Sequence, residues 1–201
     1  MIRRLDFRSR LRRVLSDEGA QLVEFAVSLP LLVVFVVGIF DFSSAFTLRL
    51  RLANLARDAA RTAAADPASD LQPGATPVSV TDAFYVIDNY LQANNINDCG
   101  ISSAPTGSGL TWTFTANGNG CSSAGLTIIV NRGYYFPAAG AAVPTISCSS
   151  QNPGAITAVI ATCVSIQYPY PWRFGKAASL LGRNASLPTQ ISTAAVALNE
   201  N

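Results

Sequence analysis

The longest apolar run of the chain covers residues 22–40 and contains one charged residue, Glu24. At about 1.5 Å per residue, roughly 20 helical residues cross the ~30 Å hydrocarbon layer of a membrane. The run therefore predicts a membrane span over residues 22–40. A carboxylate inside such a span is costly, so acids there are rare and usually functional. Glu24 either reaches headgroup water from the interface or has a partner charge.

The helical pattern continues beyond the span. Apolar residues recur at helical spacing from Leu48 to Ala63. Asp66-Pro67 ends this second helical stretch. Pro30 lies inside the span, lacks an N–H and crowds the carbonyl four residues earlier. We therefore expect a helix kink at Pro30, or local melting near Ala26.

After this helix the pattern changes to α+β. The proline-containing residues 67–80 predict a linker, and residues 81–95 predict a second, shorter helix. The turn residues 117–120 predict a hairpin, and residues 137–154 predict a loop. Strands are predicted over residues 110–115, 126–130, 156–167 and 188–198. The expected fold class is α+β: a long N-terminal helix, then residues 81–201 as a small antiparallel sheet with one short helix.

Charge is distributed unevenly along the chain. Charged residues make up 13% and the formal net charge is +2, too small to argue for nucleic acid. The basic residues crowd the first thirteen positions, as Arg3, Arg4, Arg8, Arg10, Arg12 and Arg13. A short basic run before a membrane span places the N-terminus in the cytoplasm and the C-terminal residues on the far side. An RNA-binding arm is the alternative interpretation of these arginines.

All four cysteines, Cys99, Cys121, Cys148 and Cys163, lie on that far side, and the chain contains no histidine. Their spacing does not form two close pairs, so no metal site is predicted. An even number of cysteines in an exported domain favours two disulfides, with three possible connectivities. Our preferred pairing joins sequence neighbours, Cys99 with Cys121 and Cys148 with Cys163. Unpaired, buried thiols are the alternative.

Catalytic motifs are missing. Without histidine the commonest general base is absent, and no Gly-x-Ser-x-Gly motif or phosphate-binding loop with lysine occurs. We therefore expect no enzyme and no cofactor, although the scattered acids leave an acid–base hydrolase as a weaker alternative. Aromatic residues such as Trp112 and Trp172 could line a sugar-binding face, but on strands they usually pack in the core or at an edge.

The residues before Glu24 suggest a partner for its carboxylate. Gly19 is followed by Ala20, and Glu24 is the fifth residue counted from Ala20. A cut after Gly19 would leave an ammonium on Ala20 one helical turn from Glu24. The two charges could pair within one helix or between stacked subunits, because buried charges are tolerated when paired. An ordinary signal peptide cut after Ala45 is the rival, but the apolar run is long, contains Glu24 and continues as helix.

A basic leader, a glycine and a five-residue step to Glu24-Phe25 resemble a type IV prepilin processing site. More narrowly, the first third of the chain resembles the TadE-like family, the minor pseudopilins of tight-adherence (Tad/Flp) pili. Phe25 stands where major pilins of such systems tend to have tyrosine, which points to a minor subunit. The resemblance is carried by Gly-Ala-Gln-Leu-Val-Glu-Phe-Ala at 19–26, Leu-Pro-Leu-Leu at 29–32, Gly-Ile-Phe-Asp-Phe at 38–42 and Arg-Asp-Ala-Ala-Arg at 57–61.

The resemblance implies a non-enzymatic structural or assembly subunit of a pilus. It also implies that the span and the helical stretch after it form one continuous helix over residues 20–66, roughly 70 Å long. Residues 1–19 would be a leader that a prepilin peptidase removes between Gly19 and Ala20. The expected partners are other pilin and pseudopilin subunits, the peptidase, the inner-membrane assembly platform and membrane lipid. The protein would stay in the inner membrane until it is assembled into a pilus at the cell surface. The alternative is a single-pass membrane-anchored periplasmic or cell-surface ligand-binding domain, with Glu24 incidental.

Overall fold

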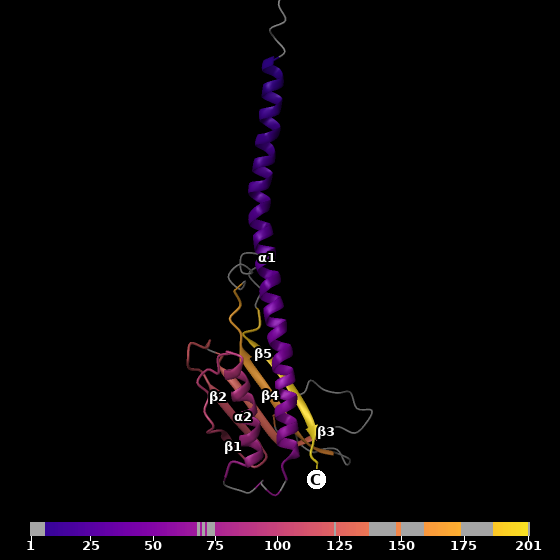
Figure 1. Ribbon diagram of the computed structural model, residues 1–201, viewed down its shortest axis with the longest axis vertical. Coiled ribbons are helices and arrows are strands. Elements are labelled where there is room, and N and C mark those ends of the chain that lie inside the picture. Colours follow the sequence, from indigo (N-terminus) through magenta and orange to yellow (C-terminus); the bar gives the residue numbers. More distant parts are fainter. Residues whose placement is uncertain are drawn as a thin grey trace, which may run out of the picture. The chain divides into compact units, whose positions relative to one another are not determined.

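The computed structural model describes residues 7–67, 69, 71, 75–122, 124–136, 148–149, 159–173 and 187–200. A long helix is followed by a short helix and a five-stranded antiparallel sheet, so the expected α+β class is confirmed (Figure 1). In chain order the elements are α1 (Phe7–Ala65), α2 (Val78–Ala93), β1 (Thr106–Ser108), β2 (Thr111–Ala116), β3 (Leu126–Phe136), β4 (Val159–Pro169) and β5 (Gln190–Leu198).

Helix α1 is longer than the sequence predicted, with 59 residues. It begins at Phe7, not near Ala20. The reason is that residues 7–18 contain neither glycine nor proline, so nothing in the leader interrupts helical propensity. Its end at Ala65, before Asp66-Pro67, is where the sequence predicted it.

The chain forms two compact units, which we describe separately. One unit comprises Met1–Ser43 with Arg173–Ser186, and the other comprises Ser44–Trp172 with Leu187–Asn201. We call the second the sheet unit. In it the strands follow the order β1-β2-β3-β4-β5, so each strand pairs antiparallel with its neighbour in sequence.

Helix α2 and the C-terminal half of α1 share one hydrophobic core with a face of the sheet (Figure 1). From α1 this core takes Leu52, Leu55 and a series of fully buried alanines, whose small side chains allow close approach of the helix. From α2, Phe84 stacks on Phe114 of β2 with ring centroids 4.7 Å apart. This burial anchors the helical residues after Ser44 to the sheet.

The observed elements differ from the prediction where local pattern is weak. Strand β1 was not predicted, because Thr106–Ser108 has only three residues and no apolar alternation. Helix α2 begins at Val78, inside the predicted linker, where the Thr81 hydroxyl donates to the Pro77 carbonyl (3.2 Å). Strand β4 begins at Val159, and most of the predicted loop 137–154 lies outside the described residues.

Strand β3 continues past Val130, where its alternation stops, through a β-bulge. Between the pairs Asn131–Cys163 and Tyr134–Ala161, two residues of β3 lie opposite one residue of β4. The extra residue is Gly133, whose N–H donates to the Asn131 side chain (2.9 Å). A Cβ at this position would lie 2.3 Å from the end of the Leu110 side chain, so any larger residue would force Leu110 to move.

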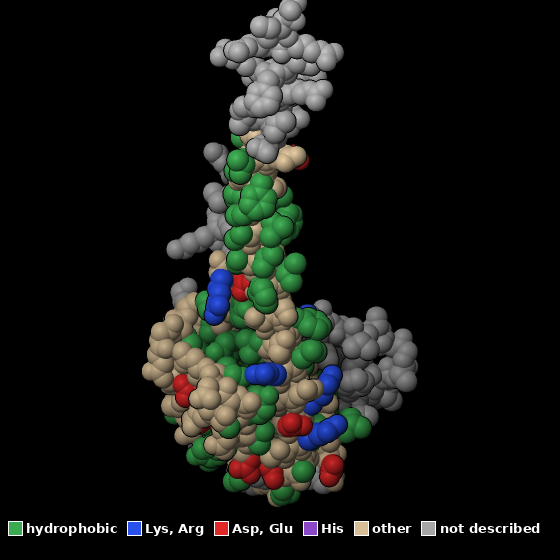
Figure 2. All heavy atoms as spheres, turned by 45° about the horizontal axis from the view of Figure 1, so that its top comes forward, with side chains coloured by type: hydrophobic (Ala, Val, Ile, Leu, Met, Phe, Trp, Pro, Cys, Tyr) green, Lys and Arg blue, Asp and Glu red, His purple; other side chains and the backbone are tan. Residues whose placement is uncertain are grey.

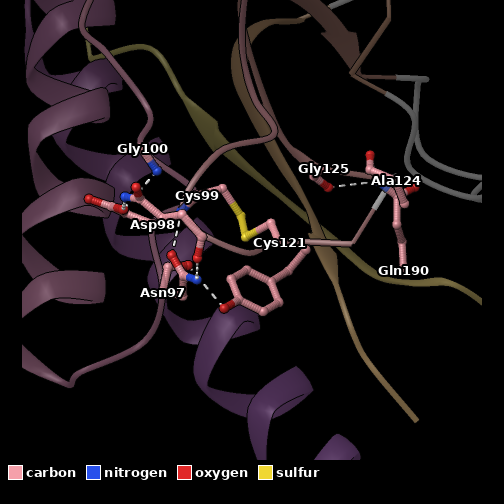
Figure 3. Close-up of a disulfide and its surroundings, with 10 residues drawn as sticks. Asn97, Asp98, Cys99, Gly100, Cys121, Ala124, Gly125 and Gln190 are labelled. Atoms are coloured by element: carbon pink, nitrogen blue, oxygen red, sulfur yellow. Dashed lines mark hydrogen bonds between the residues drawn. A yellow bond between two sulfur atoms is a disulfide. The ribbon is translucent and has the colours of Figure 1, made fainter.

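Two disulfides join the four cysteines, and both are the pairs of sequence neighbours. Cys99–Cys121 links the segment after α2 to the β2–β3 connection (Figure 3). Cys148–Cys163 links Cys148 to β4, on the face of the sheet that carries Tyr134 and Ala161. Each cross-link closes a loop of the unfolded chain and so lowers its conformational entropy. The disulfides therefore stabilise both faces of the sheet.

Tyr168 on β4 makes the sheet unit sensitive to alkaline pH. Its hydroxyl donates to the Asn97 carbonyl (2.9 Å), while burial and the nearby charge of Asp98 raise the pKa of Tyr168 above the usual value of about 10. Because the folded pKa lies above the unfolded one, this stabilisation is complete below pH about 10 and is lost as pH rises through the folded pKa.

We therefore expect Tyr168→Phe to reduce the fall in melting temperature of the full chain above pH about 10. Thermal unfolding followed by circular dichroism at a series of pH values checks this. Tyr85→Phe, which changes an exposed tyrosine of α2, is the matched control and should leave the alkaline loss unchanged. Identical pH profiles for Tyr168→Phe and the unmodified chain would contradict the assignment.

Candidate processing and assembly site on α1

The apolar segment of α1, residues 22–40, exposes its hydrophobic side chains in every direction. Leu22 is 69% exposed, Phe25 62% and Phe40 71%. Figure 2 shows hydrophobic side chains covering the visible face of this segment. A helix that is apolar on all sides needs an apolar surrounding, either lipid or other protein. Within the described residues, α1 is the one helix long and apolar enough to cross a membrane, so it could anchor the protein there.

Gly19 lies inside α1, where the local structure gives no reason for glycine. Its backbone is helical, and a Cβ built on it meets no atom within 4 Å. Glycine in a helix interior costs about 1 kcal/mol relative to alanine, because the unfolded chain gains freedom. Neither packing nor backbone conformation therefore accounts for glycine at position 19.

Ala20 and Glu24 lie on the same side of α1. They are four residues apart, which places them about 6 Å apart along the helix axis. Both belong to a shallow strip of surface that also includes Gly19, Val23 and Val27. In the uncut chain the Ala20 nitrogen is a peptide amide. Cleavage after Gly19 would convert it into an ammonium at a new helix N-terminus, on the Glu24 side.

Phe25 and Pro30 complete the set of residues predicted for this site. The Phe25 ring is largely exposed, and the Phe25 carbonyl accepts a hydrogen bond from the Ser28 hydroxyl (3.2 Å). Helix α1 is continuous through Pro30, so the local melting considered near Ala26 is not present. The helix kink at Pro30 stays a prediction.

Sequence analysis missed Arg132, which holds the C-terminal end of α1 against the sheet. Arg132 is only 1% exposed, and its guanidinium donates to the carbonyls of Ala63 and Asp66 (2.8 Å to Asp66) and to the Thr162 hydroxyl (3.0 Å). Thr162 in turn donates to the Asn199 side chain (2.7 Å), whose amide donates to the Arg132 carbonyl (3.3 Å). A cation at a helix C-terminus is favoured by the unpaired carbonyls there.

The structure thus separates two groups of residues. Gly19, Ala20, Glu24, Phe25 and Pro30 lie together on one stretch of α1, whereas the disulfides lie in the sheet unit. Within the described part of the chain, no cluster of acidic, histidine or cysteine side chains could hold a metal ion. The arrangement on α1 suits charge pairing and helix packing.

A family model matches the N-terminal part of the chain. Residues 19–61 match the family model TadE, described as TadE-like protein. The match begins at Gly19, covers the apolar segment and ends at Arg61, and it confirms the resemblance to the TadE-like family over these residues. No curated protein and no solved structure matches the chain. A TadE-like sequence implies a protein associated with the Tad pilus.

Proposed function

We propose that the chain is a minor pseudopilin of a Tad/Flp-type pilus, a non-enzymatic structural or assembly subunit that a prepilin peptidase cuts between Gly19 and Ala20. One observation carries the proposal: the glycine at position 19 has no structural reason, and it comes directly before the residue that lies on the Glu24 side of the helix. A peptidase that requires glycine before the cut bond supplies the missing reason. The TadE-like match over residues 19–61 supports the same function.

Cleavage would create the charge that Glu24 needs. After the cut, α1 begins at Ala20 with a free ammonium and several unpaired N–H groups, so positive charge gathers at its end. The Glu24 carboxylate lies one turn further and compensates this charge within the subunit or in a neighbouring one. In an apolar surrounding, either charge alone would be strongly unfavourable.

The remaining parts of the chain follow from this role. The apolar segment rests in the inner membrane before assembly and packs against other pilin and pseudopilin helices afterwards. The sheet unit is exported, because the leader arginines remain in the cytoplasm. The prepilin peptidase and the inner-membrane assembly platform are the partners during processing.

The test is the N-terminal residue of the mature protein, determined by intact mass and N-terminal peptide mapping from membranes that contain the peptidase. We expect the wild-type chain to start at Ala20 and Gly19→Leu to start at Met1. The leucine is a good helix former and meets no neighbouring atom, so the helix should be unchanged. Gln21→Leu, two residues away and exposed, is the matched control and should still be cut.

Other N-termini would contradict the proposal. A wild-type start at Met1 with active peptidase present would favour a membrane-anchored ligand-binding domain. A start at Phe46 would indicate an ordinary signal peptide and a secreted protein.

A further inference from the structure

We propose that the sheet unit contacts the membrane surface through an interface patch formed by Tyr170 and Trp172 after β4 and by Phe46, Arg49, Leu50 and Arg51 of α1. The ligand is the headgroup region of a bilayer that contains anionic phospholipid. The proposal rests on the membrane span that is part of the proposed function, and it adds that the domain lies on the lipid instead of standing away from it.

The two aromatic residues of the patch are held in fixed positions. The Tyr170 N–H donates to the Thr189 carbonyl (3.1 Å), and the Trp172 indole N–H donates to the Pro188 carbonyl (2.5 Å). Their rings meet edge to face with centroids 4.9 Å apart. Both side chains are only half-buried, so part of each ring remains exposed. Tyrosine and tryptophan in this state are typical of membrane interfaces, where one part of the ring is apolar and another is polar.

The aromatic pair lies at the end of the sheet unit where α1 enters it. At the opposite end, Arg132 ties the Ala63 carbonyl to Thr162 near the start of β4. From there β4 runs about 23 Å to Pro169 at about 3.3 Å per residue, and α1 runs back about 27 Å to Ala45 at about 1.5 Å per residue. Ala45 belongs to the same hydrophobic core against which Tyr170 and Trp172 pack, which agrees with these lengths.

The first turns of α1 in the sheet unit carry the other half of the patch. They follow the apolar segment directly: at about 1.5 Å per residue, Phe46 lies about 9 Å and Arg51 about 17 Å beyond Phe40 along the helix axis. Their side chains lean back toward the apolar segment, as side chains of a helix do. Phe46 is 60% exposed and Leu50 is 52% exposed, and Arg49 and Arg51 are exposed as well. No acidic residue occurs between positions 41 and 58.

This combination of exposed apolar and basic side chains fits an anionic lipid surface. Arginines near such a surface are attracted by its negative potential, while the apolar side chains enter the boundary between headgroups and acyl chains. Asp98 is the acidic residue beside Tyr168 on β4, and its carboxylate accepts hydrogen bonds from the Gly100 N–H (2.8 Å) and the Asn119 amide (3.4 Å) (Figure 3).

The chain contains two tryptophans, which makes the patch directly measurable. Trp112 is buried in the core, so Trp112→Phe leaves Trp172 as the reporter, and Trp172→Phe leaves the buried Trp112 as the control. The full chain is reconstituted in vesicles of phosphatidylethanolamine and phosphatidylglycerol whose acyl chains are brominated near the headgroup or near the bilayer centre. We expect bromines near the headgroup to quench Trp172 at least twofold more than Trp112, and central bromines to quench it less.

Two double variants test the role of the two arginines of the interface patch, Arg49 and Arg51. In Arg49→Gln/Arg51→Gln, quenching of Trp172 should no longer increase with the phosphatidylglycerol fraction. Arg57→Gln/Arg61→Gln, which changes two exposed arginines further along α1, is the matched control and should keep that increase. Equal dependence in both variants would overturn the proposed role of Arg49 and Arg51.

Equal, weak quenching of both tryptophans in folded protein would overturn the interface patch. If Trp112→Phe does not fold, comparing the unmodified chain with Trp172→Phe gives the contribution of Trp172 by difference. Vesicle flotation separates the two possible failures. A chain that floats with the vesicles but shows no quenching of Trp172 refutes only the patch. A chain that does not float refutes both the patch and the membrane span of the proposed function.

Discussion

Replacing Arg132 by methionine should lower the free energy of unfolding of the sheet unit by about 3 kcal/mol or more. Methionine fills a similar volume but donates no hydrogen bond. The carbonyls of Ala63 and Asp66 at the end of α1 and the hydroxyl of Thr162 would each lose a donor in a buried position. Each buried acceptor left without a partner costs about 1–3 kcal/mol.

Urea unfolding of the full chain in mild detergent, followed by tryptophan fluorescence, measures this change. Arg61→Met on the exposed side of α1 is the control, and should change the free energy by no more than about 0.5 kcal/mol. Arg132→Lys should fall between them, because a single ammonium cannot reproduce the fork of the guanidinium. A loss below about 1 kcal/mol in Arg132→Met would show that these hydrogen bonds do not hold α1 to the sheet.

Replacing Glu24 by glutamine should reduce incorporation of the protein into pili by about tenfold or more, while membrane insertion and cleavage after Gly19 continue. A tenfold change corresponds to about 1.4 kcal/mol, less than the cost of an unpaired charge in an apolar surrounding. The physical reason is that the ammonium of Ala20 would lose its compensating carboxylate when the helices pack. Glutamine keeps the size and hydrogen-bonding ability of the side chain, so the variant removes the charge alone.

The measurement is the amount of the protein in sheared pili relative to the amount in membranes. Glu18→Gln is the control, because under the proposed cleavage this acid belongs to the leader and would be absent from the mature chain. Normal pili with Glu24→Gln would show that the carboxylate is incidental, and the charge-pairing role would be abandoned.

The sequence was sufficient to predict those helices and strands that depend on the pattern of neighbouring residues. The apolar segment, the end of α1 before Asp66-Pro67 and the helix now seen as α2 follow from hydrophobic periodicity and proline. The presence of the four main strands also follows from alternation and turn residues. The start of α1 at Phe7 was not predicted, because the resemblance makes residues 1–19 a separate leader, whereas in the uncut chain one glycine inside a helix is tolerated.

The features that sequence analysis missed depend on contacts between distant segments. Nothing near Arg132 in the sequence indicates that its guanidinium reaches the end of a helix almost seventy residues earlier. The residues of the proposed processing site can be named from the sequence because their spacing is local, and their role stays a prediction. The structure adds that a side chain at position 19 would meet no neighbouring atom, which the sequence alone does not show.

The single extra residue at Gly133 determines to which face of the sheet the side chains of each half of β3 point. Before it, Val130 and Arg132 point to the helices, and Asn131 bonds to the carbonyl of Cys148 on the opposite face. After it, Tyr134 packs with Cys148 on that opposite face, whereas regular alternation would direct this ring toward α1. One strand can therefore place a cation beneath the end of the helix and, two positions later, an aromatic ring on the disulfide. Deletion of one residue here would turn every following side chain of β3 to the opposite face of the sheet.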